Sequence, residues 1–240
     1  MIGVEVANAI SQAVAQLGSV KRLIIDLRGN TGGGAGCLRL MSLMTPSKTP
    51  VGFSPGKRWS QRDLDAAKPS FPRLDKIPSS TNTLWLLGLR FLPSLLTKTP
   101  IVLETEGLGS KPYDGHIVLL VNRHTASAAE MVTVFAKENK LATIVGEKTA
   151  GRLLSATSVK VGHGFRLALP VGAYITWSGV ALEGHPIEPD VLVPFSWKER
   201  LNGFDGQLEK ALELASNPRL STQMVASGSL LSDSWPNETL

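Results

Sequence analysis

Apolar residues recur along the chain first with the spacing of a helix and then in short runs typical of strands. Within residues 1–18 they fall every three or four positions, at Ile2, Val6, Ile10, Val14 and Leu17. This spacing predicts a helix that ends at Gly18. The next apolar run, residues 21–27, is short and bounded by glycine and charge, so it predicts a buried strand. A glycine-rich loop follows over residues 28–36.

Strand and helix patterns alternate through the rest of the chain. Short apolar runs predict strands at 100–104, 116–121, 142–145 and 191–194, and helical patterns cover 126–138 and about 207–215. Residues 38–44 are a further candidate helix. Apolar residues alternate between 156 and 174, which predicts antiparallel β-structure with a hairpin turn at His163. The alternation of strands and helices is typical of an α/β fold.

Domain boundaries follow from changes in composition. We predict one domain over residues 1–216, with a long surface insertion at about 45–80, where Pro, Ser, Lys and Asp occur without a period. Residues 217–240 form a polar, Ser-rich segment that is predicted to be a disordered tail. No signal peptide is readable, and the chain begins inside a helical pattern, so we expect it to start within the fold, as an N-terminally truncated chain does.

Composition and charge exclude several classes of protein. The net charge of +5 arises from 25 basic residues scattered among 20 acidic ones, a distribution that does not suggest a nucleic-acid partner. The most apolar stretch, residues 84–96, contains Arg90 and Pro93 and is too short for a transmembrane helix. Cys37 is the single cysteine and has no Cys or His at ligand spacing, so we expect neither a metal site nor a disulfide. No cofactor motif is present.

Ser127 has the sequence environment of a nucleophile. It lies in VNRHTASAAEM, after a predicted strand and in the first turn of a predicted helix, where free N–H groups and the helix dipole favour negative charge. The N–H of Ala128 is a natural oxyanion donor, and the glycine loop with Gly32 and Gly33 offers a second. Taken separately, Ser127 also fits a helix cap and the glycines fit an ordinary turn.

Four ordered segments together resemble the C-terminal-processing (tail-specific, S41-like) serine peptidases. LIIDLRGNTGG, VNRHTASAAE, IVGEKTAGR and GVALEGHPIEPDVLV are similar to the family's segments, in the family's order, from about residue 20 to 193. The resemblance implies a crotonase-like α/β fold, Ser127 as the nucleophile, and Gly32, Gly33 and Ala128 as the oxyanion hole. It also implies a peptide or protein substrate, no cofactor, and an exported bacterial location.

The residues that activate the serine depart from the family pattern. The tail-specific branch places a lysine base 25 residues after the serine and a glutamine four residues later, but this chain has Arg152 and Ala156 there. An arginine stays protonated and cannot act as the base, so we assign Arg152 to substrate binding. The tricorn-like branch uses Ser, His and Glu, with the His far upstream. Glu183, 56 residues after Ser127, is the candidate orienting acid of that arrangement, and His124 is a candidate pocket residue.

Three functions are compatible with these features. The first is a serine endopeptidase that cleaves extended or C-terminal peptide segments through an acyl-enzyme on Ser127. The second is a non-catalytic peptide- or ligand-binding protein that keeps the peptidase fold, which the loss of the lysine base favours. An acyl-CoA enzyme of the crotonase type is the third, and the nucleophile segment argues against it. The upstream histidine of the tricorn-like branch would precede Met1, so the base is left unassigned.

Overall fold

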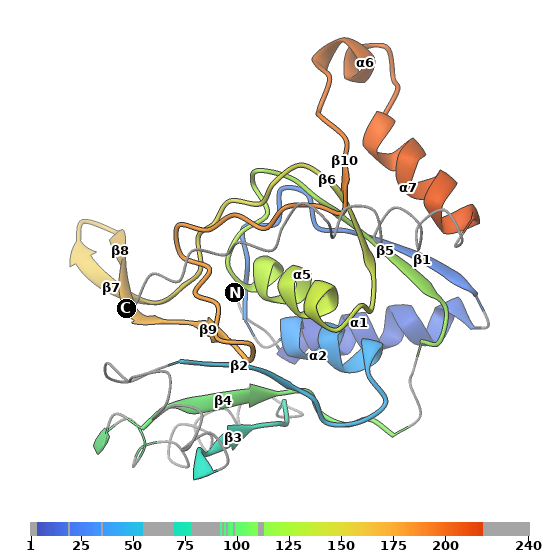
Figure 1. Cartoon of the computed structure of the whole chain (residues 1–240). Helices are drawn as coiled ribbons and strands as arrows, with labels where there is room; N and C mark the ends of the chain where they lie inside the picture. Colours follow the sequence, from blue (N-terminus) through green and yellow to red (C-terminus); the bar gives the residue numbers. More distant parts are fainter. Residues whose placement is uncertain are drawn as a thin grey trace.

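A computed structural model describes residues 4–18, 20–34, 36–54, 70–77, 92, 94, 96–97, 99–109 and 113–217. Its elements form layers (Figure 1). A four-stranded sheet carries helices on both faces, and a second four-stranded sheet lies beyond the helices of one face. The predicted α/β class is therefore confirmed.

The first sheet is parallel throughout and holds the centre of the fold. Its order is β1 (Arg22–Asp26), β5 (His116–Val121), β6 (Thr143–Gly146) and β10 (Val191–Leu192). Parallel strands buried on both faces read as continuous apolar runs, as HIVLLV does in β5. In register, Asp26 pairs with Leu120, so the carboxyl ends of β1 and β5 lie side by side.

Alternate residues of β5 enter two different cores, because successive side chains of a strand point to opposite faces. Ile117, Leu119 and Val121 pack in the cluster that contains α5 (Ala128–Glu138), whereas Val118 and Leu120 pack in the cluster that contains α7 (Gly206–Ser216). On the α5 side, α1 (Val4–Leu17) and α2 (Gly36–Met44) complete the helical layer (Figure 1).

The second sheet has the order β3 (Arg73–Leu74), β4 (Ile101–Glu104), β2 (Pro50–Ser54) and β9 (Ile175–Thr176). Strand β2 lies in its interior, with Val51, Gly52 and Phe53 buried. This differs from the surface insertion expected at 45–80, of which residues 55–69 and 78–80 lie outside the described residues. The apolar segment at 84–96 also lies almost wholly outside them, as do residues 218–240 of the predicted tail.

A two-stranded arm and a C-terminal segment complete the chain. β7 (Leu154–Gly162) and β8 (Phe165–Ala173) form an antiparallel hairpin that projects from the body (Figure 1). The predicted turn at His163 joins the two strands. After β10, a short helix α6 (Trp197–Leu201) precedes α7, which packs on β1, β5 and β6.

The strands and helices expected at 21–27, 116–121, 126–138 and 207–215 are confirmed to within two residues. No helix in the described part of the chain is long and apolar enough to cross a membrane.

Candidate functional site

Ser127 lies at the sharp turn between β5 and α5, where it is the N-cap residue of the helix. Its backbone has φ 55° and ψ −125°, a left-handed conformation that a non-glycine residue rarely adopts. Such strain costs about 1–3 kcal/mol, and surrounding contacts must hold it in place. The Ser127 N–H donates to the carbonyl oxygen of Arg152 at 2.9 Å, which fixes the turn from a second segment. A serine on a strained strand-to-helix turn is the arrangement of a presented nucleophile.

The segment after β1, which consists of Leu27 and the glycine loop, is joined to this turn by three hydrogen bonds. Ala126 N–H donates to the Asn30 carbonyl oxygen at 2.9 Å. The Thr125 hydroxyl donates to the Leu27 carbonyl oxygen at 2.9 Å, and Gly29 N–H donates to Asn122 Oδ1 at 3.0 Å. Because β1 and β5 are adjacent parallel strands, the loops at their carboxyl ends share one edge of the sheet, where ligand sites of such sheets form.

Gly32 lies directly against Ser127. A Cβ on Gly32 would stand 2.5 Å from Ser127 Cβ and 3.0 Å from Ser127 Oγ, and its φ of 104° also favours glycine. The Gly32 N–H already donates to Asn30 Oδ1 at 2.9 Å. Among the described residues, the N–H groups of Gly33 and Ala128 have no acceptor. Of the three predicted oxyanion donors, these two are therefore open to a ligand.

A buried carboxylate joins the serine turn to the segment that follows β6. Glu130, which is fully buried, accepts hydrogen bonds from four donors. These are the N–H groups of Ser127, Gly151 and Arg152, at 3.1, 2.7 and 2.9 Å, and the Thr149 hydroxyl, at 2.6 Å. The Arg152 backbone therefore lies beside Ser127, whereas its side chain is exposed.

Glu183 lies next to the same segment. Its Oε2 accepts a hydrogen bond from Leu153 N–H at 2.8 Å, and the neighbouring Gly184 N–H donates to the Gly151 carbonyl oxygen at 2.8 Å. The carboxylate is exposed. Ser127, Arg152 and Glu183, which are far apart in sequence, thus come from three segments held together by backbone hydrogen bonds.

None of the four histidines, all of which lie in the described part of the chain, forms a hydrogen bond with Ser127. His124 is exposed on the turn, and its Nε2 accepts from Arg123 Nε at 3.3 Å. His185 Nδ1 lies 3.0 Å from the Glu183 carbonyl oxygen, and His163 lies in the hairpin turn. The Nε2 of His116 is buried without a partner, and burial lowers the pKa of this ring, which disfavours its charged form.

The Asp26 and Arg28 pair at the end of β1 extends to the C-terminal helix. Arg28 binds both oxygens of Asp26, and it also reaches Asp205 Oδ1 at 2.8 Å and Gln207 Oε1 at 3.1 Å. The hydrogen bond to Asp26, with that to Asp205, raises the Arg28 pKa, and the hydrogen bond from Arg28 lowers the Asp205 pKa. Asp26 itself is half exposed, so the pair is only partly buried.

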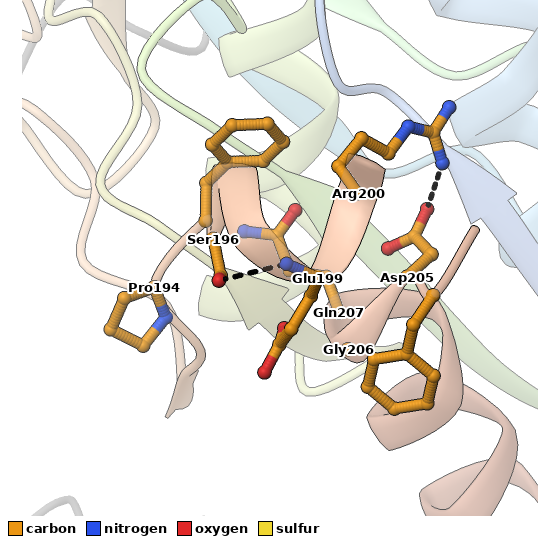
Figure 2. Close-up of a pocket in the computed structure, with 9 residues that line it drawn as sticks. Pro194, Ser196, Glu199, Arg200, Asp205, Gly206 and Gln207 are labelled. Carbon is orange, nitrogen blue, oxygen red and sulfur yellow. Dashed lines mark hydrogen bonds and ion pairs between the residues drawn. The ribbon is translucent and has the colours of Figure 1, made fainter. Parts of the chain in front are cut away.

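A small hollow lies over this network, between α6 and the start of α7 (Figure 2). In it Arg200 faces Asp205, with Nη1 3.3 Å from Oδ2. No residue of the serine turn or of the glycine loop lines this hollow. In the part of the chain that is described, no group of three or more His, Cys, Asp or Glu side chains is placed to hold a metal ion.

A larger pocket, of about 140 Å³, opens beside the serine turn. It lies between α1, the glycine loop, α2 and the start of α5. Sequence reasoning did not find it, nor the role of Glu130 as a hydrogen-bond acceptor. The helical spacing of Val6 and Ile10 was visible, but nothing in the sequence indicates that this apolar face meets the glycine loop.

Comparison with known proteins identifies similarity to one family. A statistical model of peptidase family S41 matches residues 3–193. The C-terminal processing peptidase of Tetradesmus obliquus chloroplasts is 28% identical over 164 residues, 60% of this chain and 35% of that protein. A carboxyl-terminal-processing protease of Synechocystis is 34% identical over 109 residues, 44% of this chain and 26% of that one. The chain thus matches about a third or less of the length of these relatives.

Solved structures show the same fold at lower identity. Mature CPAF superposes with a TM-score of 0.62 at 19% identity, covering 92% of this chain and 47% of that one. The photosystem II D1 C-terminal processing protease superposes with a TM-score of 0.53 at 22% identity, covering 80% of this chain and 40% of that one.

Proposed function

The chain belongs to peptidase family S41, and from that premise we propose that it is a serine peptidase that cleaves extended or C-terminal peptide segments through an acyl-enzyme on Ser127. The observation that carries the proposal is the contact between the strained Ser127 turn and Gly32. Gly33 and Ala128 line the same pocket as Gly32, and their N–H groups have no acceptor among the described residues. Relatives named as C-terminal-processing proteases support the choice of substrate.

The reaction follows from these groups. Ser127 Oγ attacks the carbonyl carbon of the scissile bond and loses its proton to a base. The N–H groups of Gly33 and Ala128 donate to the oxyanion that forms on the carbonyl oxygen. The C–N bond breaks as the leaving amine takes a proton, and water then hydrolyses the ester on Ser127. A donor of this kind is typically worth a factor of about 10²–10³ in kcat.

A fluorophosphonate probe tests the nucleophile. The probe bonds covalently to an activated serine oxygen and releases fluoride, so we expect one label, on Ser127, that is lost in Ser127→Ala. Ser158→Ala, on the exposed hairpin arm, is the matched control and should label normally. A folded protein that takes up no label would overturn the proposal and favour a non-catalytic binding protein.

We propose Glu183 as the acid that orients the general base. Glu183 is exposed, close to the Arg152 and Leu153 backbone, and so available to an imidazole that approaches Ser127. We expect Glu183→Gln to lower kcat at least tenfold with little change in KM, since glutamine can still accept from Leu153 N–H. Glu188→Gln, which alters an exposed ion pair with Lys148, is the control. Equal kcat in both variants would exclude this role.

Fold subtype and location are also proposals. We propose that the layered arrangement of a parallel sheet, helices and a second sheet is crotonase-like.

We further propose that the protein acts in an exported compartment, because its relatives are bacterial and chloroplastic processing proteases. Fractionation of cells that express the natural gene, followed by immunoblotting, tests the location; recovery in the cytoplasm alone would refute it.

A further inference from the structure

The hairpin arm formed by β7 and β8 presents an apolar face to solvent. Val159 pairs with Leu167 across the two strands, and Phe165 and Leu169 lie two positions to either side of Leu167 on β8. Because the side chains of a strand alternate between its faces and cross-strand partners share a face, these four lie together on one face. All four are exposed, and Phe165, next to the hairpin turn, is 72% exposed.

The opposite face of the arm is basic. Lys160 lies directly across from Arg166, and like charges in that position repel each other. Arg166 Nε donates to Ser158 Oγ, at 2.9 Å, on this same face. No Asp or Glu occurs in the sequence between Glu147 and Glu183, so the arm has no acidic residue of its own to neutralise the two cations. An apolar face and a positive charge are thus combined on one projecting element.

We propose that the arm docks on an anionic lipid bilayer. Its apolar face lies at the boundary between headgroups and acyl chains, and Lys160 and Arg166 lie at the level of the lipid phosphates. Amphipathic elements with one apolar and one basic face bind membranes in this way. The long stems of Lys and Arg let the charged groups reach the headgroups while the rest of the element is buried. Each such cation contributes about 1 kcal/mol, which is about fivefold in affinity.

Charge and shape favour a bilayer over a protein partner. A second copy of this chain would bring a further pair of like cations to the arm, and their repulsion would oppose the contact. The arm also projects from the body (Figure 1), whereas the apolar centre of a protein interface normally lies within a polar rim. An isolated two-stranded hairpin is marginally stable in water, so burial of its apolar face in lipid also stabilises the arm.

Docking by the arm brings the candidate site to the bilayer surface. β7 begins at Leu154, two residues after Arg152, whose carbonyl oxygen accepts from Ser127 N–H. One short segment thus joins the base of the arm to the serine turn. The docking does not depend on the proposed peptidase activity, so it is measured without a substrate.

Cosedimentation with lipid vesicles tests the proposal. We expect the chain to bind vesicles of phosphatidylcholine and phosphatidylglycerol, and to bind less to phosphatidylcholine alone or at high salt, which screens the charges. Phe165→Ser should weaken binding at least tenfold, because a buried phenyl group is returned to water. Lys160→Gln combined with Arg166→Gln should weaken it about 25-fold, fivefold for each charge.

Matched controls change the same kinds of residue elsewhere in the chain. Leu212→Ser alters an exposed leucine on α7, and Lys76→Gln combined with Lys198→Gln removes two exposed charges outside the arm. Both controls should bind vesicles as the natural chain does. Equal losses in the controls and in the arm variants would overturn the proposal, and so would a natural chain that does not bind the anionic vesicles.

A second measurement leaves Phe165 and both cations in place. A polarity-sensitive fluorophore attached at Val161→Cys, in a Cys37→Ser background, should shift its emission to shorter wavelength when anionic vesicles are added. The same fluorophore at Leu212→Cys should not shift, and equal behaviour at the two positions would contradict docking by the arm. Light scattering tests the other occupant: a dimer that Phe165→Ser converts to a monomer, without vesicle binding, would assign the apolar face to a second copy and overturn the proposal.

Discussion

Gly32 and Ser127 are in direct contact, because a Cβ on Gly32 would lie 2.5 Å from Ser127 Cβ and 3.0 Å from the Ala126 carbonyl oxygen. This is closer than Cβ atoms approach in folded proteins, so the glycine loop can reach the serine turn only where residue 32 has no side chain. The contact sets the position of the Gly33 N–H relative to the hydroxyl.

Replacing Gly32 with alanine should therefore separate the loop from the serine. We expect Gly32→Ala to lower kcat by about 100-fold, since a displacement of roughly 1 Å has that effect on a positioned reaction. Gly164→Ala is the control: it also has a positive φ, of 80°, but it meets nothing within 4 Å in the hairpin turn. Peptidase assays with both variants check the prediction, and equal loss of activity would show that backbone strain alone is responsible.

The buried carboxylate of Glu130 leads to a prediction about stability. In Glu130→Ala, three backbone N–H groups and the Thr149 hydroxyl lose their acceptor. Each unsatisfied buried group costs about 1–3 kcal/mol, and water entering the space recovers part of that, so we expect a loss of about 3 kcal/mol in the free energy of unfolding. Denaturant titration measures it.

Glu138→Gln, an exposed change on the same helix, serves as the control for Glu130. It should alter the free energy of unfolding by less than about 0.5 kcal/mol. If both variants unfold at the same denaturant concentration, the hydrogen bonds of Glu130 do not hold the serine turn in solution.

The parts of the candidate site that could be predicted are those whose residues lie in a recognisable sequence pattern of neighbouring positions. Ser127 and Ala128 were identifiable because a helix start is visible in the sequence, and parallel strand ends bring the glycine loop to them. Three of the four donors to Glu130 lie 19–22 residues further along the chain, and two of these three are backbone N–H groups, which nearly every residue type carries. No residue pattern reports such contacts.

Strand β2 was missed for a related reason. Its Pro50 and Gly52 are typical of turns. In the fold, however, Gly52 permits close packing, since a Cβ there would lie 2.4 Å from the Tyr174 hydroxyl. A glycine that is required by a tertiary contact has the same sequence signal as a glycine in a loop, so the segment at 45–80 was predicted as an insertion.

The lowered pKa of Asp205 predicts a pH dependence of stability. Because Arg28 favours the charged carboxylate, the folded pKa lies below the unfolded value of about 3.9, and the contribution is complete above that value and lost as pH falls through the folded pKa. Asp205→Asn keeps a good helix cap and removes the charge. We expect it to lower the free energy of unfolding by about 1.5 kcal/mol at pH 7, typical of a charged hydrogen bond, and by less at pH 3.

Asp114→Asn is the control for this measurement, because its ion pair with Lys21 is exposed on both sides. Such pairs contribute little, so the variant should differ from the natural protein by less than about 1 kcal/mol at either pH. A deficit of Asp205→Asn that stays constant from pH 7 to pH 3 would contradict the assignment.

Arg152 allows the missing base to be tested by replacement. Its backbone N–H shares the Glu130 carboxylate with Ser127, and its carbonyl oxygen accepts from Ser127 N–H, so a side chain at this position starts beside Ser127. A lysine there can lose its proton when desolvated, whereas arginine cannot. We expect Arg152→Lys, combined with Ala156→Gln, to label with a fluorophosphonate at least tenfold faster than Arg152→Met with Ala156→Gln. The gain should rise with pH as the lysine loses its proton. Equal rates for the two double variants at every pH would mean that the activating group reaches Ser127 from another direction, such as the side on which Glu183 lies.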